Sequence, residues 1–231
     1  MSASFLVTGT DTGVGKTLVS GGLAAELRRR GVSVGVMKPF ATGARSVRGR
    51  LVSDDALFLK KASGVDDPLE LINPSCLKPP LAPSMAAEVA GKPIDLKRVW
   101  AAYDTLCARH ESLVVEGVGG LLVPLLPRLT VADLAQKLRL PLLIVTRPAL
   151  GTLNHTALTV HVARSYGLRI LGLVINASTS AKKGLAERLN PAALELFTRV
   201  PVLGELPYLG KDPARALGHP AFGRIVDRLE S

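Results

Sequence analysis

Residues 8 to 17 form a glycine-rich segment, Thr8-Gly9-Thr10-Asp11-Thr12-Gly13-Val14-Gly15-Lys16-Thr17. It follows a short apolar run, Phe5–Thr8, and opens a segment of helical spacing, Lys16–Arg30. A glycine-rich turn between a strand and a helix lets backbone N–H groups converge on phosphate oxygens, and the helix N-terminus adds a partial positive charge there. The stretch therefore predicts a phosphate-binding loop.

Two residues of this loop have defined tasks in a nucleotide site. Lys16 would reach the β- and γ-phosphates, and Thr17 would place its hydroxyl on Mg²⁺. The strict form of the motif has glycine at the position of Thr10, whereas this chain has Gly9 one residue earlier. The alternative interpretation is a plain strand-to-helix turn with an incidental lysine, but the flanking strand and helix favour the phosphate site.

The rest of the chain repeats the alternation of strand and helix. Continuous apolar runs rich in β-branched residues are typical of strands covered on both faces, and therefore of a parallel sheet with helices on either side. The runs are Phe5–Thr8, Val32–Met37, Leu113–Val115, Leu142–Thr146, Ile170–Ile175 and Val202–Leu206. Helical patterns between them include Lys16–Arg30, a helix capped by Asp95, and Asn154–Tyr166. We predict an α/β fold with a mostly parallel sheet and helices on both faces.

The domain organisation follows from the absence of a low-complexity linker. The segment Pro68–Pro93 is rich in proline, which predicts an irregular insertion on the ligand side of the sheet. We therefore expect residues 1–231 to form a single domain.

Composition excludes several other classes of protein. Of the 231 residues, 47% are hydrophobic and 21% charged, as in a globular protein that buries a core. The net charge of +10 is compatible with nucleic acid, but the basic residues are scattered and the aromatic residues (Phe 5, Tyr 3, Trp 1) are too few for a base-stacking surface. No apolar run approaches the ~18 residues that cross a bilayer. A small polyanionic substrate fits better than nucleic acid or a membrane.

The two cysteines, Cys76 and Cys107, lie far apart in the sequence and belong to no C-x-x-C pair. This pattern excludes a disulfide framework and a cysteine-based zinc site, and we expect two buried thiols in a reducing compartment. The first residues show neither the basic flank nor the long apolar stretch of a leader peptide, so we expect a cytoplasmic protein.

A second charged segment is Val114–Gly120, which places Glu116 at the carboxyl end of a buried strand. Ligands of open α/β sheets bind outside that end. A carboxylate there is costly unless a cation pairs with it, and the nucleotide's Mg²⁺ is the nearest candidate. The alternative is a solvated loop carboxylate.

A third segment follows the second predicted strand and begins with Lys38. We expect this strand to lie beside the first, so that the Lys38 ammonium points toward the same phosphates. Farther on, we interpret Asp54 as a helix cap and Asp55 as a metal ligand. The alternative for Lys38 is a solvated strand end.

Together these segments resemble the dethiobiotin synthetase family of biotin biosynthesis, in the family's order from Gly9 to about Leu209. The segments that carry the resemblance are Gly9–Thr17, Met37–Gly43, Ser53–Leu57, Val115–Gly120 and Leu150–His155. The resemblance implies a P-loop NTPase-like fold and a ligase that uses ATP and Mg²⁺. It further implies a homodimer that joins CO₂ to 7,8-diaminononanoate and closes the cyclic urea of dethiobiotin, giving ADP and phosphate.

The resemblance also implies roles for single residues. Lys38 and Lys16 would be catalytic, the metal would be held by Thr17, Asp55 and Glu116, and Thr42 would contact the substrate. The substrate carboxylate would be received across a dimer interface by Gly151, Thr152, Leu153 and Asn154. The implied nucleotide-binding set is Thr12, Gly13, Val14, Gly15, Lys16, Thr17, Leu18, Asp55, Glu116, Gly117, Val118, Gly119, Asn176, Ala177, Pro207, Tyr208 and Leu209.

Two other functions share this fold and loop. An ATPase switch of the partitioning or septum-positioning type carries a second lysine early in the loop, where this chain has Asp11. A P-loop amide ligase of the cobyrinate type needs a glutaminase domain, for which 231 residues leave no room. A plain nucleotide-binding module is the third alternative.

Overall fold

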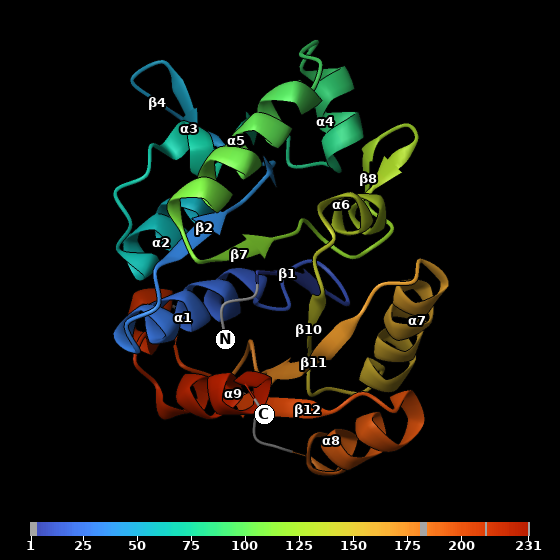
Figure 1. Ribbon diagram of the computed structural model, residues 1–231. Coiled ribbons are helices and arrows are strands. Elements are labelled where there is room, and N and C mark those ends of the chain that lie inside the picture. Colours follow the sequence, from blue (N-terminus) through green and yellow to red (C-terminus); the bar gives the residue numbers. More distant parts are fainter. Residues whose placement is uncertain (1–3, 181–183, 211, 231) are drawn as a thin grey trace.

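The computed structural model describes residues 4–180, 184–210 and 212–230. Its centre is a six-stranded sheet in the order β12-β11-β10-β1-β7-β2 (Figure 1), and every strand pair in it is parallel. The strands are β1 (Phe5–Gly9), β2 (Val34–Met37), β7 (Ser112–Glu116), β10 (Leu142–Thr146), β11 (Ile170–Asn176) and β12 (Val202–Leu206). The predicted α/β class is confirmed, because all six predicted apolar runs are strands of this sheet.

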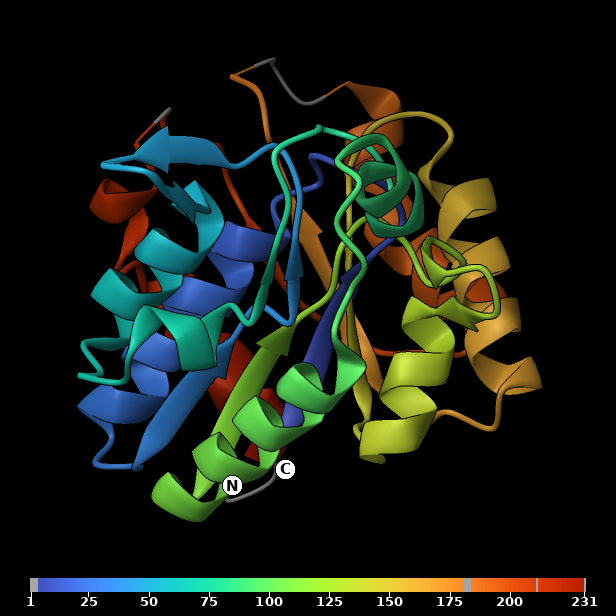
Figure 2. The ribbon, with the colours of Figure 1, turned by 90° about the horizontal axis from the view of Figure 1, so that it is seen from above.

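Helices cover both faces of the sheet. One face carries α1 (Lys16–Arg29), α2 (Asp54–Ser63) and α9 (Pro220–Glu230). The other carries α5 (Leu96–Arg109), α6 (Val131–Leu138), α7 (Thr152–Ser165) and α8 (Leu185–Thr198). Figure 2 shows α1 and α2, in blue and teal, on one side of the strands and α6 and α7, in yellow-green and gold, on the other.

This layering explains the continuous hydrophobicity of the strands. Successive side chains of a strand point to opposite faces. In β1, Phe5 and Val7 belong to the apolar cluster of α1, α2 and α9, whereas Leu6 belongs to the cluster of α5 to α8. Each face therefore needs its own apolar residues, which makes consecutive positions of the strand apolar.

Smaller elements surround the carboxyl edge of the sheet. They are β3 (Phe40–Ala41), β4 (Arg45–Val47), β5 (Arg50–Val52), α3 (Leu69–Ile72), β6 (Ser75–Cys76), α4 (Pro83–Val89), β8 (Pro124–Leu126), β9 (Leu129–Thr130) and a 3₁₀ turn, Pro213–Ala216. The proline-rich segment thus contains α3, β6 and α4, and β6 pairs in parallel with β3. None of the helices in the described part of the chain is long and apolar enough to cross a membrane.

Three expectations were wrong in detail. Strand β7 lies between β1 and β2, so the second predicted strand is not the neighbour of the first. Ser53 rather than Asp54 caps α2, since its Oγ accepts from the Ala56 N–H at 3.3 Å while Asp54 pairs with Arg45. Cys107 is exposed and Cys76 half-buried, so they are not two buried thiols.

Candidate active site

A cleft of about 520 Å³ opens at the carboxyl ends of β1, β2 and β7. It brings together predicted residues from four of the five motif segments. The exception is the segment at the start of α7. The predicted residues that line it are Thr12, Gly13, Gly15, Lys16, Thr17, Lys38, Thr42, Asp55, Glu116, Val118 and Gly119. Sequence reasoning missed an apolar part of its wall, formed by Pro80, Leu81, Ala82 and Val123.

The loop between β1 and α1 has the backbone of a phosphate cradle. Gly13 and Gly15 have φ angles of +74° and +97°, a left-handed conformation that favours glycine. At Gly15 there is also no room, because a Cβ would lie 2.1 Å from the Asn176 amide nitrogen. Val14 is fully buried beneath the loop, and Leu18 packs partly against the same apolar cluster, so these two support the loop rather than line the cleft.

Lys16 is folded back onto the loop. Its Nζ donates to the Asp11 carbonyl oxygen at 2.9 Å, and the residue is 6% exposed. Burial, together with repulsion from Lys38, lowers the pKa of Lys16 to about 8. An ammonium that has lost most of its water gains strongly from a negatively charged ligand.

Lys38 and Glu116 form a buried ion pair deeper in the cleft. The Lys38 Nζ lies 2.5 Å from Glu116 Oε1, 3.2 Å from Asp55 Oδ2 and 3.1 Å from the Gly117 carbonyl oxygen. The Thr17 hydroxyl donates to the same Glu116 oxygen at 2.8 Å. The actual strand order produces this pair, because β2 and β7 are neighbours, Lys38 directly follows β2 and Glu116 is the last residue of β7.

The backbone at Lys38 is fixed by the insertion. Its N–H donates to the Ile72 carbonyl at 2.7 Å, and the Asn73 amide donates to the Lys38 carbonyl at 2.7 Å. Asn73 is 7% exposed. The proline-rich segment therefore positions a cleft lysine as well as lining the cleft.

Two carboxylates compete for this one ammonium. Burial disfavours the charged form of Lys38, but the charges of Glu116 and Asp55 outweigh it and raise the pKa of Lys38. Burial raises the pKa of Glu116, and the Asp55 charge adds to the rise while Lys38 opposes it. Lys16 adds a second positive charge in the same cleft, so a further cation is favoured by the Glu116 oxygen that Lys38 leaves without a partner.

The residues present fit Mg²⁺. Glu116 Oε2 is buried without a hydrogen-bond partner, and Asp55 and the Thr17 hydroxyl approach the same region. Hard cations take such oxygen ligands, and Mg²⁺ completes its shell with waters and phosphate oxygens. In the described residues there is no group of three or more His, Cys, Asp or Glu side chains that could hold a metal by itself.

A second cavity, of about 430 Å³, lies on the other side of the loop between the ends of β10, β11 and β12. Gly13 and Ala177 line it. Asn176 borders this region, donates to the Val14 carbonyl at 2.8 Å and keeps a buried Oδ1 without a partner. Pro207, Tyr208 and Leu209 follow Leu206, which lines the cavity, but do not line it themselves.

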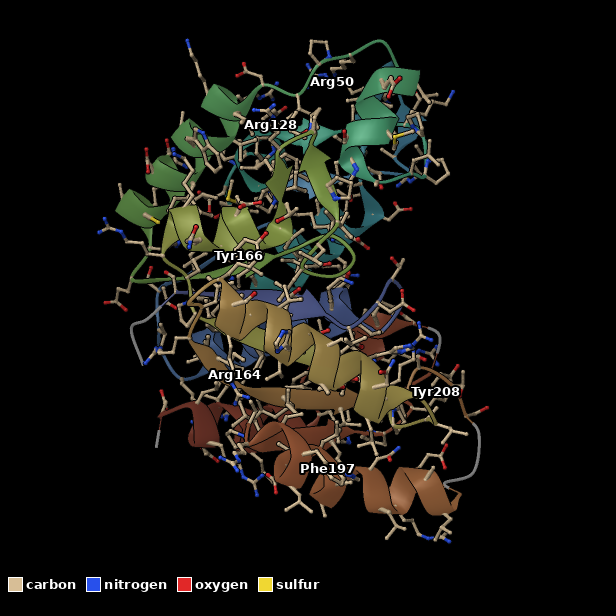
Figure 3. All side chains as sticks on the ribbon, turned by 90° about the vertical axis from the view of Figure 1, so that its right-hand side faces the viewer. Arg50, Arg128, Arg164, Tyr166, Phe197 and Tyr208 are labelled. Atoms are coloured by element: carbon tan, nitrogen blue, oxygen red, sulfur yellow. The ribbon has the colours of Figure 1, made fainter. Side chains whose placement is uncertain are left out.

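The segment Gly151–Asn154 is not in the cleft of its own chain. Gly151 precedes α7 with a φ of +93°, Thr152 is buried, and Asn154 is exposed. Figure 3 shows Tyr208 at the end of the molecule where α7 begins, whereas Arg164 and Tyr166 mark the other end of that helix. Binding of a substrate carboxylate by this segment remains a prediction, as do the other ligand roles.

Affinity for a nucleotide is expected to fall as the pH rises above about 8. A triphosphate favours the charged form of Lys16, so binding raises the pKa of this group from its lowered value of about 8 and takes up a proton above that pH. Titration with a fluorescent ATP analogue should give a nearly constant affinity around neutral pH and a loss approaching about tenfold per pH unit above it. A Lys16→Arg control should lack this dependence, and a flat wild-type profile to about pH 9.5 would contradict the expectation.

Comparison with known proteins decides the family. A family model described as an AAA domain matches residues 3–212. The ATP-dependent dethiobiotin synthetase of Thermodesulfovibrio yellowstonii is 40% identical, over 96% of this chain and 95% of its own length. The protein of the same name from Bacillus velezensis is 45% identical, over 94% and 91%. The chain belongs to the dethiobiotin synthetase family.

Two solved structures of ATPases share the fold. The cell division ATPase MinD of Pyrococcus furiosus has a TM-score of 0.57 at 20% identity, with 98% of both chains covered. A ParA family ATPase from Chlorobium tepidum has a TM-score of 0.55 at 17% identity, with 100% and 99% covered. At these identities the likeness shows the fold alone. The predicted P-loop fold and the predicted enzyme class, an ATP-dependent ligase of the dethiobiotin synthetase family, are confirmed.

Proposed function

We propose that the protein carboxylates 7,8-diaminononanoate with CO₂ and closes the cyclic urea of dethiobiotin, at the expense of ATP and with Mg²⁺. The observation that carries this proposal is the buried Lys38 ammonium, which lies in the same cleft as the phosphate loop and Lys16. A cleft that only bound a nucleotide would have no need of a second desolvated lysine beyond the phosphate loop. Two cations at one site suit a reaction in which two anions, a carbamate and a triphosphate, must meet.

The reaction needs no enzyme nucleophile. One substrate amine forms a bond to CO₂ and loses a proton, giving a carbamate. A carbamate oxygen then attacks the γ-phosphorus, the bond to the ADP oxygen breaks, and a mixed carbamic–phosphoric anhydride results. The second amine attacks the anhydride carbon and loses a proton, and phosphate leaves with the former carbamate oxygen.

The chain's own residues would stabilise the charge that spreads during these steps. Lys38 would hold the carbamate and then the transferred phosphoryl oxygens, while Lys16 and the loop N–H groups would hold the β- and γ-phosphates. Thr42, half-buried in the cleft, would position the diamine. Thr17, Asp55 and Glu116 would hold Mg²⁺, which would supply charge neutralisation on the phosphate oxygens.

We place the base of the nucleotide in the second cavity. The free Asn176 Oδ1 is an acceptor that suits the exocyclic amine of adenine. Ala177 lines the cavity, and the segment Pro207–Leu209 directly follows Leu206, which also lines it. Gly117, Val118 and Gly119 follow the end of β7 and would contact the nucleotide; Val118 and Gly119 line the first cleft.

The proposed enzyme is a homodimer. Gly151–Asn154 lies outside the cleft of its own chain, and Leu150 beside it is 91% exposed. The same segment of a second copy would reach this cleft with the free N–H groups of its helix start and bind the substrate carboxylate. We place the reaction in the cytoplasm, without nucleic-acid or membrane partners.

Incubation with ATP, Mg²⁺, bicarbonate and the diamine tests the proposal. Mass detection should find a urea product in amounts equal to the ADP formed. ATP hydrolysis without a urea, stimulated instead by DNA or vesicles, would support the switch ATPase and overturn the ligase.

A further inference from the structure

Arg147 lies just after β10 and contacts the phosphate loop at two points. Its Nη2 donates to the Asp11 carboxylate at 3.0 Å and to the Thr12 carbonyl at 2.9 Å. The other Asp11 carboxylate oxygen accepts from the Thr12 N–H at 2.7 Å. One guanidinium therefore fixes both the side chain and the backbone of the first half of the loop.

The loop is also held from its buried side by the residue before Arg147. The Thr146 hydroxyl lies 3.3 Å from that of Thr10, and Thr146 is fully buried. Residues 10 to 12 are thus attached to the end of β10 from both sides. Lys16 contacts the same segment, because it donates a hydrogen bond to the Asp11 carbonyl. To bind a triphosphate, its side chain would have to turn toward the ligand.

The pair between Arg147 and Asp11 is too exposed to matter much for stability. The two side chains are 43% and 53% exposed, and such pairs contribute little to folding. The contacts instead fix the conformation of the loop. Without them, the ligand would have to order the loop N–H groups when it binds. Ordering a loop before binding lowers the cost of binding.

We propose that Arg147 is a positioning residue for the nucleotide: with Asp11 it holds residues 11 and 12 so that the phosphate loop is ordered before the triphosphate arrives. The inference rests on the nucleotide-binding part of the proposed function and not on its urea chemistry. It gives a role to Asp11, which occupies the position of the additional lysine in switch ATPases.

A competing interpretation is direct contact with the base. Arg147 and Gly13 both line the second cavity, so a guanidinium there could stack on a base. Inorganic triphosphate separates the two interpretations, because it has phosphates for the loop but no base for the cavity.

The test compares Arg147→Gln with Arg169→Gln, the same change at an exposed residue just before β11, at the opposite edge of the sheet. We expect Arg147→Gln to raise the KM for ATP about tenfold, to leave kcat within about twofold, and to weaken competitive inhibition by inorganic triphosphate by the same factor. Arg169→Gln should change none of these. Arg147→Lys should recover part of the loss, since it keeps the charge beside Asp11.

Asp11→Asn gives an independent check through its partner. It should raise the KM for ATP as Arg147→Gln does, and the double variant should be no worse than either single one. Additive losses, an unchanged KM, a loss confined to kcat, or weaker binding of ATP but not of inorganic triphosphate would each overturn the proposal. Expected binding results without any urea product would refute the proposed reaction and leave this inference standing.

Discussion

Lys38→Ala is expected to lower turnover at least about a hundredfold, which is the scale of losing one charge-stabilising donor. Nucleotide binding should be nearly unchanged. Lys38 is 3% exposed, and its ammonium pairs directly with the buried Glu116. If Lys16 and the loop N–H groups bind the triphosphate as proposed, the loss should appear in kcat and not in the affinity for ATP.

A matched control is available on α2. Lys61 is exposed, and Lys61→Ala removes the same charge without touching the cleft. Removing Lys38 leaves a buried carboxylate without its main partner, which also destabilises the fold. Lys38→Gln, which can still donate to Glu116, should keep the protein folded and show the same loss of turnover. Normal turnover in both Lys38 variants would exclude this lysine from the mechanism.

Glu116→Gln is expected to raise the Mg²⁺ concentration needed for half-maximal activity by about tenfold or more. The amide keeps the shape and can still accept from Thr17, but it removes the charge that a hard cation prefers and the carboxylate oxygen that has no protein partner. Activity should be measured against Mg²⁺ at fixed ATP, and heat stability against Mg²⁺ at fixed ADP.

Glu111→Gln is the corresponding control at the other end of β7. Glu111 is exposed and accepts from the Ser33 N–H, far from the cleft along the strand. Its substitution should leave both Mg²⁺ titrations unchanged. If Glu116→Gln also left them unchanged, the assignment of Glu116 to the metal would be wrong.

The fold was predictable because each central strand is covered on both faces. Positions such as Phe5, Leu6 and Val7 must all be apolar, so each strand can be recognised as a continuous apolar run in its own segment of the sequence. The order of the strands is set by pairing between distant segments, so the position of β7 between β1 and β2 could not be read from any one of them.

The residues of the candidate site were predictable where they belong to a sequence motif, as Gly15, Lys16 and Glu116 do. The pairing of Lys38 with Glu116 depends on which strands are neighbours and was not expected. Leu81 and Arg147 were missed because an apolar residue in an insertion and an arginine after a strand have no local pattern that distinguishes them from ordinary surface residues.

Transfer of oxygen from bicarbonate to phosphate distinguishes activation of a carbamate by ATP from other routes to the urea. In the proposed reaction the carbamate oxygen that attacks the γ-phosphorus leaves with the phosphate. A short incubation with ¹⁸O-labelled bicarbonate, ATP, Mg²⁺ and the diamine should therefore give inorganic phosphate that carries one labelled oxygen for each urea formed. Unlabelled phosphate, formed before the label exchanges with water, would contradict activation of the carbamate by phosphoryl transfer.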